Sequence, residues 1–225
     1  MPKYFIFGVG GLILGLAIGF TGANSLNRDA GESQSAPAMP QTGASTGNST
    51  SVPQSGMQAD VAQTIAKAND EPQNFAVQMR TGDMYAQIGK FDKALEYYTR
   101  GIALKPADFQ AIVVLANAYF DSRKFEEAAK FYEKALAVKP DDVNARTDLG
   151  ATFVERQNPD FDRAINEFQA ALKLQPNYEP TLYYLGIAYF RKGDTSNANA
   201  TLAELEKANP TSELIARLKQ NMSVQ

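Results

Sequence analysis

The sequence of 225 residues contains no cysteine, no histidine and no tryptophan. Without cysteine the chain has no disulfide, no thiolate nucleophile and no zinc–thiolate site. Without histidine it lacks the commonest general base and the commonest metal ligand. No glycine-rich phosphate loop and no nucleophile elbow stands out either. These absences argue against an enzyme and against a bound cofactor or metal.

The charges are nearly balanced. A formal net charge of -3 arises from 22 basic and 25 acidic residues that are interspersed along the chain. Because no basic stripe is present to neutralise phosphates, a nucleic-acid partner is not expected. In KFEEAAKFYEK, acids and lysines alternate as they do on a solvated helix face that carries salt bridges.

An uncharged apolar run, YFIFGVGGLILGLAIGF, follows Met1-Pro2-Lys3, and TGA extends it to twenty residues. At about 1.5 Å per residue, a helix of that length spans the hydrocarbon core of a bilayer, about 30 Å. Residues 1–23 are therefore predicted to be a transmembrane anchor; the alternative is a signal peptide cleaved near Ala23. The positive-inside rule keeps the N-terminus cytoplasmic, so the remainder is expected outside the cytoplasm.

Gly11, Gly15 and Gly19 recur at intervals of four in this run and would form one ridge on a helix. Such a ridge could join two copies of the anchor into a homo-oligomer. Glycine is also simply frequent in membrane helices, which is the non-functional interpretation. Residues 24–58 are rich in small and polar residues with few large apolar ones, and they are predicted to be a flexible linker.

The rest of the chain repeats with a period near 34 residues. The small residues of the repeat are Gly82, Ala116, Gly150 and Gly186, and the aromatics three positions later are Tyr85, Tyr119, Phe153 and Tyr189. Alanines follow at Ala94, Ala128, Ala164 and Ala198, each with a large side chain four residues on, at Tyr98, Tyr132, Phe168 and Leu202. The prolines are Pro106, Pro140, Pro176 and Pro210, with gaps of 34, 36 and 34.

Each repeat fits two antiparallel helices. In VLANAYF and TLYYLGIAYF, apolar residues recur at intervals of three and four, which predicts a helix with one buried face. The small residue and the alanine allow the two helices to approach closely, and the proline ends the second helix. Asp108, Asp142 and Asn177 then stand where the next helix needs an N-cap.

This spacing resembles the tetratricopeptide repeat family, with its L-G-x2-Y, A-x3-F and P pattern. The resemblance implies an all-α fold, a right-handed α-solenoid of antiparallel helix pairs. Four repeats are predicted at residues 75–108, 109–142, 143–178 and 179–212. Residues 59–74 are predicted to be a half repeat or N-capping helix, and 213–225 a C-terminal capping helix.

The third repeat is two residues longer than the first two. Its inner loop reads ERQNPDF where the others read QIGKF, DSRKF and RKGDT. The insertion near Asn158-Pro159 is expected between the helices, where chain length can change without a shift of helical register. Asp160 is expected to cap the helix that follows.

The resemblance implies that the first helix of each repeat lines a concave face that binds a segment of another protein. The positions on that face that the core does not claim are Met79, Arg80, Asp83, Gln110, Val113, Val114, Asn117, Phe120, Asn144, Thr147, Asp148, Ala151, Val154, Tyr183, Tyr184, Ile187, Phe190 and Arg191. Asn117 is at a position from which family members often hydrogen-bond a peptide backbone. The valines and tyrosines could instead pack against the preceding repeat.

The expected partner is a protein or peptide. Met79 and Asp83 stand where relatives that capture a C-terminal carboxylate carry a basic clamp, so an apolar or mixed segment is expected rather than an acidic tail. The favoured function is a membrane-anchored scaffold or assembly factor, resembling bacterial envelope proteins with the repeats in the periplasm. The alternatives are a self-associating structural spacer and a cytosol-facing receptor on an organelle outer membrane.

Overall fold

The computed structural model describes residues 54–223, with side chains from residue 61 onward. It divides into residues 1–70, whose described helix is α2 (Gln54–Asp70), and residues 71–225. The predicted anchor, its glycine ridge and residues 24–53 of the predicted linker lie outside the described part. Of the helices that are described, none is both long and apolar enough to cross a membrane.

The helix α2 differs from the prediction at both ends. It begins within the predicted linker, so residues 54–58 are helical. It stops at Asp70 because Pro72 disfavours helical geometry at the residue before it. The packing of this helix as a cap of the array stays a prediction.

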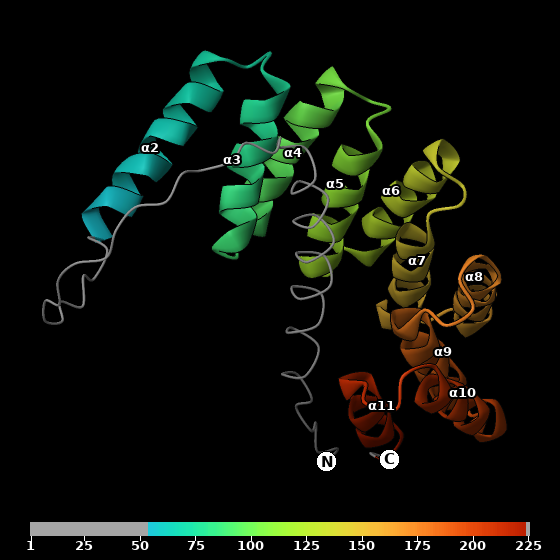
Figure 1. Ribbon diagram of the computed structural model, residues 1–225. Helices are drawn as coiled ribbons and strands as arrows, with labels where there is room; N and C mark the ends of the chain where they lie inside the picture. Colours follow the sequence, from blue (N-terminus) through green and yellow to red (C-terminus); the bar gives the residue numbers. More distant parts are fainter. Residues whose placement is uncertain (1–53, 224–225) are drawn as a thin grey trace, which may run out of the picture. The chain divides into compact units, whose positions relative to one another are not determined.

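Residues 71–223 form helices and no strands, which confirms the predicted all-α solenoid. Figure 1 shows these helices as successive hairpins, each stacked on the next. The pairs are α3 (Phe75–Gln87) with α4 (Phe91–Leu104), α5 (Phe109–Asp121) with α6 (Phe125–Val138), α7 (Val143–Glu155) with α8 (Phe161–Leu174), and α9 (Glu179–Lys192) with α10 (Thr195–Ala208), followed by α11 (Glu213–Ser223). The first helices begin at the residues predicted to open the four repeats.

Short polar side chains start most of these helices. The Asp108 carboxylate accepts a hydrogen bond from the Ala111 N–H at 2.9 Å, and Asp142 and Asp160 cap α7 and α8 in the same way. The prediction for Asn177 is wrong, because Tyr178 is the residue directly before α9. That helix begins without a side-chain cap and is favoured instead by the fixed backbone angle of Pro180.

The two extra residues of the third repeat lie in the loop between α7 and α8, as predicted. In the first two repeats this loop closes with a bond from the Lys90 or Lys124 N–H to the Tyr85 or Tyr119 carbonyl, at 2.9 Å. The longer loop closes with the equivalent bond, from the Asp160 N–H to the Phe153 carbonyl at 3.0 Å. The insertion is therefore absorbed without a change in how the helices are joined.

The glycines of the repeat lie directly against a large side chain. A Cβ added at Gly82 or Gly150 would lie 2.5 Å from the ring of Tyr98 or Phe168. At Gly186 the neighbour is Leu218 of α11, at 2.8 Å, and not Leu202. Leu202 is shorter than the aromatics at its position, so the capping helix fills the space that they fill elsewhere.

We expect the substitution Gly150→Ala to lower the free energy of unfolding by about 1–3 kcal/mol, because the rigid ring of Phe168 must move. Gly101→Ala is the matched control, since its new Cβ would meet the flexible end of Met79 at 2.6 Å. Urea unfolding followed by circular dichroism measures both. An equal loss in the two variants would contradict the close packing at Gly150.

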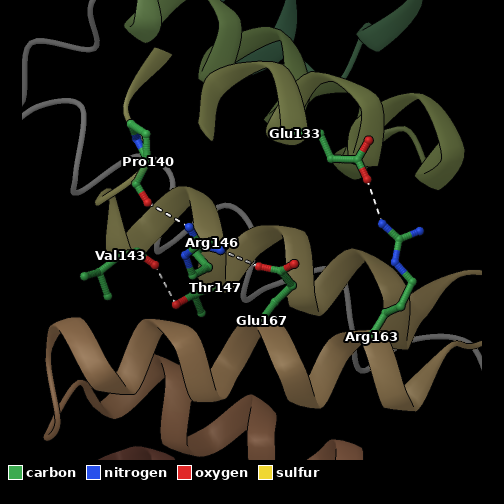
Figure 2. A network of polar contacts seen from close by, with 7 residues as sticks. All are labelled: Glu133, Pro140, Val143, Arg146, Thr147, Arg163 and Glu167. Carbon is green, nitrogen blue, oxygen red and sulfur yellow. Dashed lines mark hydrogen bonds and ion pairs between the residues drawn. The ribbon is translucent and has the colours of Figure 1, made fainter. Parts of the chain in front are cut away.

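An inter-repeat network fixes the orientation of α7, as Figure 2 shows. The Arg146 guanidinium bonds the Glu167 carboxylate and the Pro140 carbonyl, each at 2.7 Å. Arg163 bonds Glu133 of the preceding repeat at 2.8 Å and also lies over the Phe153 ring, 4.2 Å from its centroid. Residues two positions apart on a helix point to nearly opposite sides, so Asp148 is turned away from Arg146.

Candidate functional site

The predicted concave face divides by exposure into three groups. Exposed side chains are Arg80, Asp83, Gln110, Asn144 and Arg191. Half-buried side chains are Met79, Val113, Val114, Asn117, Phe120, Asp148, Tyr184 and Phe190. Buried side chains are Thr147, Ala151, Val154, Tyr183 and Ile187. The surface that a ligand could touch therefore comprises the first two groups, and the third is occupied by contacts within the chain.

Contacts between α7, α9 and α11 occupy two of the buried side chains, Thr147 and Tyr183. The hydroxyls of Thr147 and Thr181 are 2.6 Å apart and join α7 to α9. The Tyr183 ring meets the Tyr184 ring edge-on at 5.2 Å, and its hydroxyl accepts a bond from the Asn221 amide of α11 at 3.2 Å. Tyr183 is therefore held by the capping helix and is unavailable to a partner.

The ninth residue of α3 and of α5 is polar and accepts a hydrogen bond from a buried tyrosine hydroxyl. The Tyr98 hydroxyl donates to Asp83 at 2.8 Å, and the Tyr132 hydroxyl donates to the Asn117 oxygen at 2.7 Å. The third repeat has Phe168 in place of the tyrosine, and its ninth position is Ala151. The polar residue thus accompanies the hydroxyl, as expected if a buried O–H needs an acceptor. The Asn117 amide N–H groups remain for a ligand carbonyl.

The middle of this face is acidic. Burial raises the pKa of Asp148 to about 7, with smaller contributions from the charges of Asp142 and Asp121. Burial also raises the pKa of Asp121 to about 6. The pKa of the Tyr132 hydroxyl is raised by burial and then by the charges of Asp148 and Asp121, which places both carboxylates near one hydroxyl. Neither carboxylate forms a hydrogen bond or ion pair within residues 54–223.

Two arginines of the first helices are paired. Arg191 bonds Glu155 at 3.2 Å, and Arg146 bonds Glu167 as described. Asp121 was not among the residues predicted for the face. It is the thirteenth residue of α5, and Arg191 is the thirteenth of α9. Had the thirteenth position been included for every first helix, as it was for α9, Asp121 would have been predicted for the face.

Aromatic side chains border the acidic region. Tyr184 stacks on Phe168 with centroids 6.2 Å apart, and Phe120 meets Phe125 edge-on at 5.3 Å. Both are half-buried, so part of each ring is open to solvent. Across residues 54–223 no group of three or more acidic side chains could hold a metal ion. The arrangement provides hydrogen-bond acceptors, amides and apolar rings, which are groups that bind a polypeptide.

Comparison with known proteins agrees with this description. A family model described as tetratricopeptide repeat matches residues 85–147 and 155–222, and a second model with the same description matches residues 58–109. A search of curated proteins found no match.

Solved structures share the fold. A crystal structure of MamA has a TM-score of 0.61 and 19% identity, covering 68% of this chain and 88% of that one. MamA from residue 41 to its end, from Desulfovibrio magneticus RS-1, has a TM-score of 0.62 at 18% identity, covering 69% and 87%. TTC0263, a thermophilic tetratricopeptide repeat protein of Thermus thermophilus, has a TM-score of 0.58 at 18% identity, covering 74% and 91%. With family models matched over more than half of its length, the chain belongs to the tetratricopeptide repeat family.

Proposed function

We infer that the protein is a membrane-tethered interaction module that binds a segment of another protein on the face formed by α5, α7 and α9. Tetratricopeptide repeat proteins are in general interaction scaffolds rather than enzymes. The proposal rests on the mixture of apolar and polar side chains on this face. The first helices that form it carry half-buried Val114, Phe120 and Tyr184 together with the exposed polar residues Gln110 and Asn144. Such mixtures are typical of the centre and rim of a protein interface.

The tether is part of the proposal. Residues 1–23 are long and apolar enough to span a bilayer if helical, and residues 24–53 would separate the array from its surface. With Lys3 before the span, the repeats would lie outside the cytoplasm, in a bacterial periplasm. A self-associating anchor through Gly11, Gly15 and Gly19 stays a prediction, because those residues lie outside the described part.

Site-specific photocrosslinking tests the proposed face. A photoreactive residue placed at Gln110 or Asn144 in the full-length chain, in native membranes, is expected to form a discrete adduct with one partner. The same residue at Lys130 or Lys173, which are exposed on the second helices, is the matched control. The substitution Phe120→Asp should abolish the adduct while the helical circular dichroism signal is retained. Equal adducts from the control positions would contradict the assignment of the face.

A further inference from the structure

Among the helices that stack on a preceding repeat of residues 71–223, which are α5, α7, α9 and α11, the sixth position is apolar or aromatic in all but one. In α3, the first helix of that part, the sixth residue is the exposed Arg80. That position is Val114 in α5, Tyr184 in α9 and Leu218 in α11, and all three are apolar or aromatic. Tyr184 stacks on Phe168, and Leu218 fills the space beside Gly186. In α7 the same position is Asp148. A carboxylate has therefore replaced the side chain that fills the joint between repeats.

Nothing in the described part of the chain neutralises this carboxylate. The charges that shift the pKa of Asp148 are those of Asp121 in α5 and Asp142 before α7. The groups whose pKa values are raised by the charge of Asp148 are Tyr132 of α6, and Tyr178 and Tyr184 on the side of α9. All are acids or hydroxyls. Asp142 is paired with Lys139, and Arg146 is turned toward Glu167. A half-buried charge without a partner lowers stability, so its presence in a repeat joint points to a use other than packing.

The second carboxylate lies on the neighbouring first helix. Asp121 is the single charged residue of α5, so no cation of that helix competes for it. The charges of both carboxylates add to the raised pKa of the Tyr132 hydroxyl, which donates a hydrogen bond to Asn117 of α5 at 2.7 Å. Several other half-buried ionic side chains have partners, among them Arg146 with Glu167 and Arg156 with Asp160. The central face thus has two negative charges and lacks the positive charge that would complement them.

We propose that the segment bound on this face carries a lysine or arginine side chain, and that its charge lies between Asp121 and Asp148. This rests on the proposed function. An apolar residue beside that cation lies on the open part of Tyr184 or Phe120, and the Asn117 amide donates to a backbone carbonyl of the segment. The ligand is a basic segment with apolar neighbours, whereas the missing basic clamp at Met79 and Asp83 predicted an apolar or mixed one. Charge complementarity of this kind determines partner choice and the rate of association.

The proposal implies a pH dependence of binding. A cation holds the two carboxylates ionised, so binding releases the protons that they carry at low pH. Affinity therefore increases as the pH rises through the pKa values of about 6 and about 7, and levels off above them. Because each proton released corresponds to a tenfold change per pH unit, the affinity at pH 8 should exceed that at pH 5.5 by about ten- to a hundredfold. A ligand without a cation would show no such increase.

The test is a selection from a random library of peptides of about twelve residues, a length suited to an extended or helical segment in a groove. The full-length chain is presented in a mild detergent because of the apolar run at residues 4–20. Enriched peptides should contain lysine or arginine next to an apolar residue. Asp148→Asn and Asp121→Asn should each weaken a selected peptide about tenfold or more, and the control Asp162→Asn, exposed on α8, should not. Replacing the peptide's lysine by methionine should remove the difference between Asp148→Asn and the parent chain.

The outcomes separate the two proposals. Neutral or acidic peptides that bind the parent chain, lose binding in Phe120→Asp and do not respond to Asp148→Asn would overturn the basic ligand and leave the proposed face standing. A selection that enriches no peptide over the Phe120→Asp chain would overturn both. A merely structural role for Asp148 would also show itself, because a neutral variant would then weaken lysine-containing and methionine-containing peptides equally.

Discussion

The substitution Phe168→Ala is expected to lower the free energy of unfolding by about 3–5 kcal/mol. Phe168 is fully buried, and its ring lies against Gly150 and stacks on Tyr184 of the next repeat. Its removal leaves a cavity in a joint that holds two repeats together. Urea unfolding of the full-length chain in detergent, followed at the helical circular dichroism band, measures the loss.

Leu202→Ala is the matched control for that experiment. Leu202 follows Ala198 as Phe168 follows Ala164, but Leu202 is half-buried and Gly186 is filled by Leu218 instead. We expect the control to lose about 1–2 kcal/mol, less than a fully buried site. A loss at Leu202 as large as that at Phe168 would show that the two repeats share one packing scheme, against the contacts described above.

Neutralising Asp148 is expected to raise the free energy of unfolding rather than to lower it. The folded-state pKa of Asp148, about 7, lies above the ordinary value of 3.8, so the folded chain holds the proton more tightly than the unfolded chain. The contribution of Asp148 to stability is therefore greatest at low pH, falls as the pH rises from about 4 to about 7, and is constant above. Asp148→Asn removes this fall. At pH 8 the variant should be more stable than the parent chain by about 2–4 kcal/mol, from about 1.4 kcal/mol per pKa unit.

The measurement is the free energy of unfolding at several pH values between 4 and 8. The two chains should agree near pH 4 and separate as the pH rises. Asp162→Asn serves as the control, since that carboxylate is exposed and its removal should give a curve parallel to the parent. A variant less stable than the parent at pH 8 would mean that the charged form of Asp148 has a partner. Together with weaker binding of a basic peptide, a gain in stability would be the pattern of a residue kept for binding rather than folding.

The helix pairs could be predicted from the sequence because their determinants are local and periodic. Gly82, Gly150 and Gly186 each lie against a large side chain, and the first helices begin at the predicted residues. The exposure of the predicted concave face could not be predicted in the same way. Tyr183 and Tyr184 are adjacent and chemically alike, yet Tyr183 is buried and Tyr184 is half-buried. The hydroxyl of Tyr183 accepts a hydrogen bond from Asn221, which lies thirty-eight positions away in α11. A helical period assigns a residue to a face and does not say what covers that face.

The acidic centre was missed for a related reason. Asp148 was predicted for the face as one member of a mixed surface, and Asp121 was not predicted. Their importance depends on the absence of a cation nearby, which follows only when Arg146 is seen to point toward Glu167. In the sequence Arg146 and Asp148 are two residues apart and would be read as compensating charges. The sequence therefore suggests that Arg146 balances the charge of Asp148, whereas in the fold Arg146 is paired with Glu167 instead.

The contact between Leu218 and Gly186 has a consequence for how the array ends. The last repeat does not fill its own joint, because the residue that does so belongs to α11. Native packing of α9 and α10 therefore depends on α11, because the side chain that lies against Gly186 comes from that helix.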